Sequence, residues 1–309
     1  MKNTFLKIIK EICVENNIEY KLLSKDFIVM LKKNKTIKFL YGYKFDLNNH
    51  GIGMIMDDKF GMYEVLKELK IPVIEHKIVY NKNNHNDYAK GCNTYEYVYD
   101  YFKKNNNHIV IKPNNGTCGN DVFQIKNIEE IEKVLNHLFL SNFSISMCPF
   151  YKIKHEYRVI VLNNNIELLY KKCLPVVFGD GKKTIKELLL DFNYNYFKKI
   201  VNDSKYNKVL KESEKFEYNF KFNLSQGAIT KKVTDKELII KLTKLAKSIS
   251  QNINLNFGSI DIIETTNNEL LVMEINSGVM LENYLILNQD EYLKVKDIYQ
   301  KAIDSLFKK

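Results

Sequence analysis

Two apolar segments, 257–264 and 270–275, constrain the fold of this chain most strongly, because their pattern predicts the two strands of a β-hairpin. The Asn-Asn pair between them suits the two positive-φ positions of a type I′ turn. Counting outward from that turn pairs Asp261 with Glu274, and Asn276 shares a face with Glu274 because side chains alternate along a strand. The sequence therefore predicts two facing carboxylates and an amide on one side of the hairpin.

Like charges directly opposite each other destabilise a strand pair, so these carboxylates need a compensating charge. A divalent cation would supply it: Mg²⁺ prefers oxygen ligands, keeps several waters and commonly bridges to substrate phosphates. Asp261, Glu274 and Asn276 are therefore candidate ligands for Mg²⁺, with Mn²⁺ as the other candidate ion. The alternative is a solvated hairpin face on which the charges never meet.

The composition describes a globular protein. With 309 residues, 45% of them hydrophobic, the chain can form two or three compact units. We expect a soluble, cytoplasmic protein without membrane partners, because there is no apolar run of about 18 residues and charged residues interrupt the N-terminal apolar pattern. The 5 cysteines are scattered without a Cys-x-x-Cys pair, which argues against a disulfide framework or a zinc site.

The net charge of +10 raises the possibility of a nucleic-acid partner. We expect none, because the lysines are spread along most of the chain and no recognition motif for nucleic acid is present. A nucleotide or an acidic small substrate would use the same charge.

The order of apolar and polar segments indicates an α+β or α/β fold. A helix is expected after Asp57 and Asp58, either of which could cap it, and capping-box signals at Thr184 and Thr234 predict two more. Segment 191–222 is predicted to be helical but exposed or mobile. Further helices are predicted at 5–12, 95–102, 128–140 and 292–307, and strands at 26–31, 36–41, 71–80, 108–112, 121–126, 144–148, 157–162 and 166–171.

Three further groups of residues could carry chemistry. The glycine-containing loop 113–120 follows Lys112, so its backbone N–H groups and the ammonium could contact phosphate. Glu156 and Arg158 lie two apart on a strand and face the same side, and Lys221 and Asn223 are predicted to do so on another. Each group alone also suits an ordinary structural role. The predicted roles of His50 and His155 are structural.

The order of these motifs resembles the ATP-grasp superfamily of carboxylate–amine ligases. The resemblance is greatest to the ATP-grasp domain of cyanophycin synthetases and glutathione-synthetase-type ligases, and it spans about 57–284. The matching segments are DDKFGMYEVLKELKIPV, IVIKPNNGTCGNDV, EYRVIVL, LPVVFGDGKKTIKELL, NLSQGAITKKVTD, and GSIDII followed by MEINSG.

The resemblance implies an ATP-grasp fold, in which the nucleotide lies between two α+β subdomains. We expect a short N-terminal α/β unit at 1–55, a linker helix and the start of the ATP-grasp region at 56–107, the small subdomain with the phosphate loop at 108–150, and the C-terminal subdomain with the metal site at 151–309.

The resemblance also implies roles for individual residues. ATP would be held at its phosphates by Lys59, Lys112 and the loop containing Gly116, Thr117 and Gly119, at its adenine by Cys148, Phe150 and Tyr151, and at its ribose by Glu156. Arg158 and Lys221 would face the γ-phosphate or acyl phosphate, Asn223 would line the reaction centre, and Asp261, Glu274 and Asn276 would bind the metal.

The sequence also departs from the family pattern. Lys221 stands where an arginine is usual, which replaces a bidentate fork by a point charge. Ala228 replaces a frequent second glycine, and Cys118 lies in the phosphate loop. The leading unit is short, and the additional ligase domain of cyanophycin synthetases is missing, so polymer synthesis of that kind is not implied.

The expected activity is ATP-dependent formation of an amide, through an acyl phosphate, between a small-molecule or peptide carboxylate and an amine. A homodimer is one candidate assembly. Three alternatives remain: a peptide-tailoring ligase that closes side-chain amides or esters, a small-molecule kinase on the same scaffold, and a nucleotide-binding module without activity. Product analysis separates a ligase of either kind from a kinase, because a kinase releases a stable phosphorylated product and needs no amine.

Overall fold

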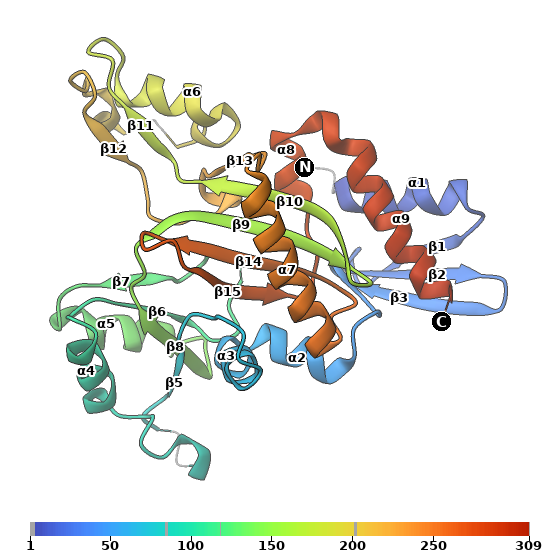
Figure 1. Cartoon of the computed structure of the whole chain (residues 1–309), viewed down its shortest axis with the longest axis horizontal. Coiled ribbons are helices and arrows are strands. Elements are labelled where there is room, and N and C mark those ends of the chain that lie inside the picture. The colour runs from blue at the N-terminus through green and yellow to red at the C-terminus, as the bar shows by residue number, and fades with distance from the viewer. Residues whose placement is uncertain (1–3, 84–85, 118, 201–202, 309) are drawn as a thin grey trace.

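The computed structural model describes residues 4–83, 86–117, 119–200 and 203–308. Its N-terminal unit is a helix and an antiparallel sheet, as predicted. The elements are α1 (Thr4–Glu15), β1 (Glu19–Leu23), β2 (Ile28–Lys33), β3 (Thr36–Tyr41) and β4 (Lys44–Phe45), and the strand order is β1-β2-β3-β4. α1 and the C-terminal helix α9 (Tyr292–Lys308) cover one face of this sheet (Figure 1). Val29, Leu31 and Leu40 point into that covered face and are buried.

Two helices lead from this unit to the rest of the chain: α2 (His50–Asp57) and α3 (Lys59–Glu68). The predicted cap is confirmed, because the Asp58 carboxylate accepts a hydrogen bond from the Gly61 amide at 2.7 Å. This cap fixes the first turn of α3, and with it the position of Lys59.

A four-stranded antiparallel sheet follows, in the order β5-β8-β6-β7. Its elements are β5 (Lys77–Tyr80), η1 (Asp87–Ala89), α4 (Tyr95–Lys104), β6 (Ile109–Pro113), β7 (Phe123–Ile125), α5 (Glu129–Leu138) and β8 (Ser144–Pro149). The predicted helices of this region are confirmed, and both share a core with the sheet. The predicted strand 71–80 is wrong in its first half. There the chain contacts the other sheet instead, with the Ile74 amide donating to the Val272 carbonyl at 3.0 Å.

The largest sheet has five strands in the order β13-β10-β9-β14-β15. Its strands are β9 (Ile153–Leu162), β10 (Asn165–Cys173), β13 (Ile229–Lys231), β14 (Phe257–Thr265) and β15 (Leu270–Asn276), and α7 (Lys236–Ile253) packs on one face (Figure 1). The capping prediction for α7 is wrong by one residue. Asp235, not Thr234, accepts from the amides of Glu237 and Leu238.

Segment 191–222 differs from its prediction. α6 (Ile185–Phe197) begins with the predicted capping box at Thr184, but it is kinked at Asn193. The rest is a short 3₁₀ helix, η2 (Ser204–Asn207), and a strand, β12 (Lys215–Glu217), which pairs with β11 (Val176–Phe178). Phe197 and Tyr206 belong to a separate small core. The segment is therefore neither mainly helical nor fully exposed, because its aromatic residues bury one another.

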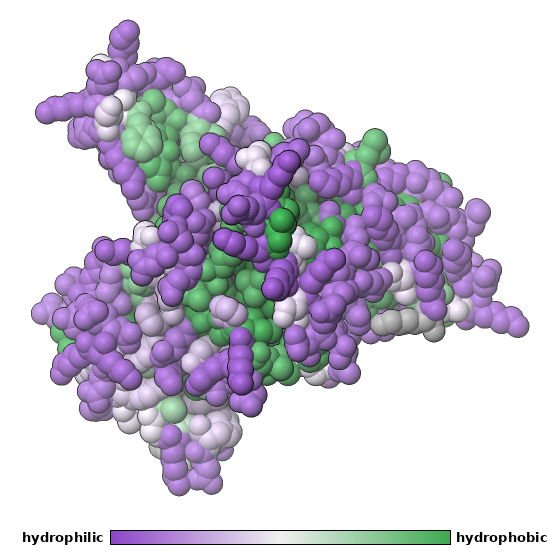
Figure 2. All heavy atoms as spheres, in the orientation of Figure 1, coloured by the Kyte–Doolittle hydropathy of each residue, from purple (hydrophilic) through white to green (hydrophobic). Residues whose placement is uncertain are grey.

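The predicted strand around Lys221 and Asn223 is also absent. Residues 219–223 are irregular and lead into η3 (Leu224–Gln226). α8 (Glu282–Leu287) and η4 (Gln289–Glu291) connect β15 to α9. None of the described helices is both long and apolar enough to cross a membrane. Figure 2 shows hydrophilic residues over most of one face, with hydrophobic residues at its centre and in the part formed by α6, β11 and β12.

The hairpin of β14 and β15 has the predicted pair but not the predicted turn. Of the two turn asparagines only Asn268 has a positive φ, and the Asn268 amide donates to the Thr265 carbonyl, so the loop has three residues and is not type I′. This shifts the register near the turn by one residue. A bulge opposite Asp261 and Ile262 shifts it back, so Asp261 still faces Glu274.

Candidate active site

A cavity of about 550 Å³ lies between the four-stranded and five-stranded sheets. Its lining comes from both sheets, from the loop after β6, from segment 220–225 and from the N-terminal unit. All of the predicted site residues line it: Lys59, Lys112, Gly116, Thr117, Gly119, Cys148, Phe150, Tyr151, Glu156, Arg158, Lys221, Asn223, Asp261, Glu274 and Asn276. Cys118 lies outside the described residues. The structure thus brings the predicted residues together, while their roles stay predictions.

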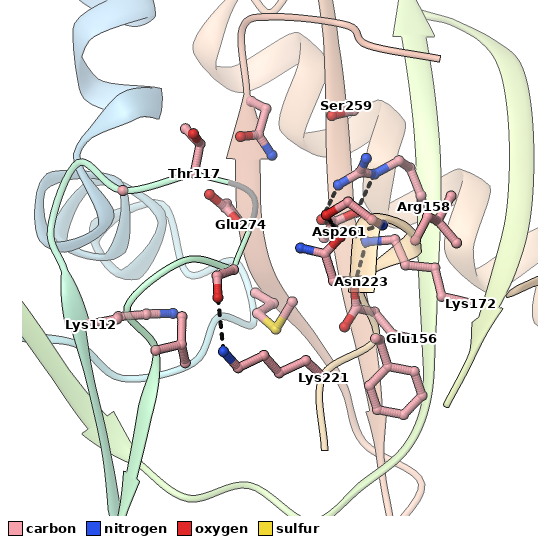
Figure 3. A pocket seen from close by; sticks show the side chains of 18 of the residues that line it. Lys112, Thr117, Glu156, Arg158, Lys172, Lys221, Asn223, Ser259, Asp261 and Glu274 are labelled. Atoms are coloured by element: carbon pink, nitrogen blue, oxygen red, sulfur yellow. Dashed lines mark hydrogen bonds and ion pairs between the residues drawn. The ribbon is translucent and has the colours of Figure 1, made fainter. Parts of the chain in front are cut away.

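One row of side chains crosses four neighbouring strands at the floor of the cavity. The pairing places Tyr170 beside Arg158, Arg158 beside Asp261 and Asp261 beside Glu274. The Arg158 guanidinium donates two hydrogen bonds to the Asp261 carboxylate, Nε to Oδ1 at 2.7 Å and Nη2 to Oδ2 at 2.6 Å (Figure 3). Asp261 is buried and Arg158 is partly buried, and the two parallel bonds between them fix the orientation of both groups.

Lys172, on β10, connects Glu156 of β9 to Asp261 of β14. Its Nζ donates to Glu156 Oε1 at 2.5 Å and to Asp261 Oδ2 at 3.0 Å (Figure 3). Burial acts to raise the pKa of Asp261, but the Arg158 and Lys172 charges outweigh it and lower this pKa to about 2. Burial raises the pKa of Glu156 to about 7, although Lys172 opposes the rise. Asp261 therefore stays ionised at neutral pH, whereas Glu156 binds a proton more readily than an exposed carboxylate does.

Lys59 stands between the phosphate loop and Glu274. Its Nζ donates to the Gly116 carbonyl at 2.5 Å and lies 3.5 Å from Glu274 Oε1. Burial lowers the pKa of Lys59, and the nearby Lys112 acts in the same direction, while Glu274 raises it. Two lysine ammonium groups, on α3 and β6, therefore lie near the same loop, where they would attract an anion.

The phosphate loop also contacts segment 219–226 on the far side of the cavity. Lys221 Nζ donates to the Gly119 carbonyl at 2.9 Å (Figure 3). Gly119 has φ +66°, and a Cβ added there would lie 2.8 Å from Asn223 Nδ2. The loop thus approaches this segment so closely that only glycine fits without a shift.

The segment that joins the two sheets lines one end of the cavity. It follows β8 and contains Phe150 and Tyr151, while the buried Cys148 lies in the last two residues of β8. The Phe150 ring stacks on His108 with centroids 4.0 Å apart, and the Tyr151 hydroxyl accepts from the Glu75 amide at 3.1 Å. An aromatic surface held in this way suits a flat heterocycle.

The donor set of Asp261, Glu274 and Asn276 suits Mg²⁺ in kind, because all three offer oxygen atoms to the cavity. Among the described residues no cluster of three or more His, Cys, Asp or Glu could hold a metal ion. Two carboxylates and an amide form an incomplete oxygen shell, which suits Mg²⁺ bound together with substrate phosphates. Without the ion, the cations of this chain compensate both carboxylates: Arg158 and Lys172 at Asp261, and Lys59 at Glu274.

Sequence reasoning missed Lys172 and Asn114. Lys172 follows Leu168 and Tyr170 on a face of β10 that is otherwise apolar and buried. A lysine at such a position is rarely buried without a partner, so the sequence did contain a sign that Lys172 belongs to the site. Asn114 is buried; its Nδ2 donates to Asp58 Oδ1 at 2.8 Å, and its Oδ1 accepts from the Phe60 amide at 3.1 Å. These bonds fix the phosphate loop to the start of α3. The residues they join are far apart in the sequence, so the pattern of neighbouring residues does not reveal the contact.

Residues 200–297 match the model of the RimK-like ATP-grasp domain. A sequence search of characterised proteins returned no significant match. Among solved structures, the chain is similar to a bifunctional glutathione synthetase from Pasteurella multocida (15% identity, TM-score 0.53), covering 95% of this chain and 44% of that one. It is also similar to D-alanine–D-alanine ligase from Bacillus anthracis (14% identity, TM-score 0.55), covering 84% and 69%.

A third similar structure is the D-cycloserine synthetase DcsG, with 14% identity and a TM-score of 0.50, covering 84% of this chain and 73% of that one. At such low identity these matches show the fold that the proteins share. The chain spans less than half of the glutathione synthetase. The activities of these proteins are therefore evidence for a proposal, which the cavity has to support.

Proposed function

We propose that this chain, which has the ATP-grasp fold, is an ATP-dependent ligase that joins a carboxylate to an amine through an acyl phosphate. The carboxylate and the amine belong to amino acids or peptides. The observation that carries the proposal is one cavity in which lysines from α3, β6 and segment 219–223 surround a glycine loop and face the row that contains Arg158, Asp261 and Glu274.

ATP would bind with its adenine against the segment from Cys148 to Tyr151 and its phosphates under the loop 113–120. Lys59 and Lys112 would neutralise phosphate charge, and the backbone of Gly116, Thr117 and Gly119 would lie over the phosphates. Glu156 would accept a hydrogen bond from the ribose while Lys172 holds its other oxygen. The stacked Phe150 ring supports this placement of the adenine end.

In the first step, an oxygen of the substrate carboxylate attacks the γ-phosphorus and ADP leaves with the electron pair of the broken bond. Negative charge on the transferred phosphoryl oxygens would be stabilised by Arg158 and Lys221, which both line the cavity. Asp261 holds the Arg158 guanidinium in one orientation, so that no reorganisation is needed as charge develops.

In the second step, the amine attacks the acyl carbon, and inorganic phosphate leaves as the amide forms. The amine loses one proton as the amide forms, and the departing phosphate takes it up. Asn223, on segment 220–225, would orient the acyl group. No nucleophile from the protein is required.

Asp261, Glu274 and Asn276 would hold Mg²⁺, or Mn²⁺ in its place, against the phosphate oxygens. When bound, the ion would neutralise phosphate charge and align the β- and γ-phosphates. The residues of this chain contribute oxygen atoms for that purpose, and Lys59 stays beside Glu274 on the same side of the cavity.

The test is ADP release from ATP in the presence of amino acids and short peptides, with the product identified by mass. We expect release that needs both a carboxylate and an amine, and a product that has lost one water relative to the two substrates. A stable phosphorylated product without an amine requirement would show a kinase and reject the proposal. Matched reactions without the amine separate slow ATP hydrolysis from ligation.

A further inference from the structure

The N-terminal sheet has one covered face and one exposed apolar face. α1 and α9 cover the first, whereas Figure 1 shows no described helix over the second. The apolar residues of the second face, called the outer face below, come from the turn before β2 and from β2 and β3: Phe27, Ile28, Met30, Ile37, Phe39 and Tyr41.

Large side chains of the outer face are unusually exposed. Ile37, Phe39 and Tyr41 alternate along β3 and are 49%, 50% and 61% exposed, while their neighbour Leu40 is fully buried. Phe27 is 51% exposed, and its ring meets Tyr41 edge-on with centroids 4.7 Å apart. Apolar residues that gather on one surface in this way mark a contact site, whereas isolated ones do not.

The outer face continues into the candidate active site. Phe27 and Tyr41 line the cavity that also holds Arg158 and Asp261, so an occupant of the cavity can run directly onto β3. The backbone of this junction is fixed, because the Gly42 amide donates to the Phe27 carbonyl at 2.8 Å. An occupant that contacts both surfaces would have to be long and extended, with one end in the cavity.

The charge around this face indicates the chemistry of the occupant. Residues 19–41 contain lysines at 21, 25, 32, 33, 35 and 38, but only two carboxylates, Glu19 and Asp26. Lys32 pairs with Ile37 across the strands and Lys21 pairs with Met30, so these two lysines border the apolar side chains, although Lys32 Nζ also lies 3.1 Å from Glu19 Oε1. Lys38 pairs with Leu31 of the covered face and does not belong to this border. A partner that is both apolar and acidic complements this arrangement.

We propose that the outer face binds an extended acidic peptide with apolar side chains, and that this peptide is the substrate whose reacting group enters the cavity. The inference rests on the proposed function for the reaction at that end. Apolar side chains at alternate positions of the peptide pack on Phe39 and Ile37, and its carboxylates face the surrounding lysines. The surface selects the peptide, and the cavity modifies it.

The test uses the whole chain without nucleotide and three short fluorescein-labelled peptides, with binding followed by anisotropy. One is acidic with phenylalanine and leucine at alternate positions, one is acidic with serine in their place, and one is basic but keeps the apolar residues. We expect the first to bind about tenfold more tightly than the others. Equal affinity for all three would overturn the proposal.

The test variant is Ile37→Ser combined with Phe39→Ser, because neither residue lines the cavity and both are exposed. It should weaken binding of the acidic apolar peptide about tenfold. The control is Phe178→Ser, which removes an aromatic residue that is 60% exposed on β11 and lies outside the outer face. It should change the affinity less than about twofold. Binding that is unchanged in the double variant overturns the proposal.

Two further measurements distinguish a peptide site from a dimer interface, and a failure of the outer face from a failure of the ligase. If wild-type protein dimerises in sedimentation and the double variant does not, the outer face binds a second copy of the chain, and the peptide proposal fails. ADP release with single amino acids but no peptide binding rejects the outer face alone. If peptide binding depends on Phe39 but no substrate pair gives ADP release, the proposed ligase activity is rejected. The proposal that the outer face binds a peptide is then retained.

Discussion

Arg158 on β9 and Asp261 on β14 are joined by two parallel hydrogen bonds of 2.7 and 2.6 Å across adjacent strands. Lys172 adds a third bond to the same carboxylate. Asp261 is thus both a predicted metal ligand and the group that orients a predicted catalytic arginine. Its replacement should affect folding and turnover together.

Asp261→Asn is expected to lower the free energy of unfolding by about 3–5 kcal/mol, because an amide N–H₂ would face the buried Lys172 and the partly buried Arg158, which lose their counter-charge. Turnover should fall about 100-fold or more, since Arg158 loses its orienting partner. Urea denaturation and ADP release measure the two effects. Glu264→Gln is the control, because that carboxylate bonds Lys154 and Tyr157 outside the cavity. Full turnover of Asp261→Asn would contradict both predicted roles.

Lys172→Met should destabilise the protein by about 3 kcal/mol, because Glu156 and Asp261 remain buried with one cation fewer. The loss should grow with pH. In the wild type the folded pKa of Glu156 is raised to about 7, so its stabilising contribution is complete below about pH 4.5 and is lost as pH rises through 7. Without Lys172 that pKa rises further and the loss continues to higher pH. Urea denaturation across this range measures it.

The matched control for Lys172→Met is the double variant with Glu156→Gln, in which no charge at position 156 remains to be compensated. At high pH the double variant should have a higher free energy of unfolding than Lys172→Met alone, and this free energy should no longer change with the titration of position 156. If the single and double variants had the same pH profile, the Lys172–Glu156 ion pair would not be the cause.

The predicted pairing of Asp261 with Glu274 was correct although the predicted turn was not. The three-residue loop moves the register by one, and the bulge at Met273 moves it back. Loop length and bulges depend on how strands twist against their neighbours, so a local pattern does not determine them. The alternation that places Glu156 and Arg158 on one side of β9 was predictable, because it needs only the period of a strand.

Other parts of the site depend on contacts that sequence spacing cannot reveal. The lysine that joins Glu156 to Asp261 comes from β10, and the sequence does not state which strands pair. Lys221, in the irregular segment 219–223, bonds the Gly119 carbonyl 102 residues away. Fold and residue types were readable from motif order, whereas the ion network had to be observed.

Gly119→Ala should weaken ATP binding about tenfold, because the residue has φ +66° and its new Cβ would lie 2.8 Å from Asn223 Nδ2. The shift needed to relieve this contact moves the phosphate loop. Gly53→Ala is the control: its Cβ would meet nothing within 4 Å on helix α2, so it should stabilise by about 0.5–1 kcal/mol and leave ATP affinity unchanged. Calorimetric titration with ATP compares them, and equal affinities would contradict the role of this loop.

His76 should make the protein sensitive to mild acid. Its ring is fully buried beside the cavity lysines, its Nδ1 lies 2.6 Å from Ser146 Oγ, and its Nε2 has no hydrogen-bond partner among the described residues. Burial, followed by the charges of Lys112 and Lys59, lowers its pKa well below 6.5. The unfolded chain therefore binds a proton that the folded chain does not, and stability is lost as pH falls below about 6.5.

His76→Asn keeps a polar group near Ser146 but cannot titrate in this range. Between about pH 7.5 and 5.5, wild type should lose about 1.4 kcal/mol more unfolding free energy than the variant, which is the cost of one pKa unit below 6.5. Urea denaturation at the two pH values gives the difference directly, and other titrating groups cancel because both proteins share them. Parallel losses in the two proteins would mean that the folded state accepts the proton at His76, and that the neighbouring lysines do not exclude it.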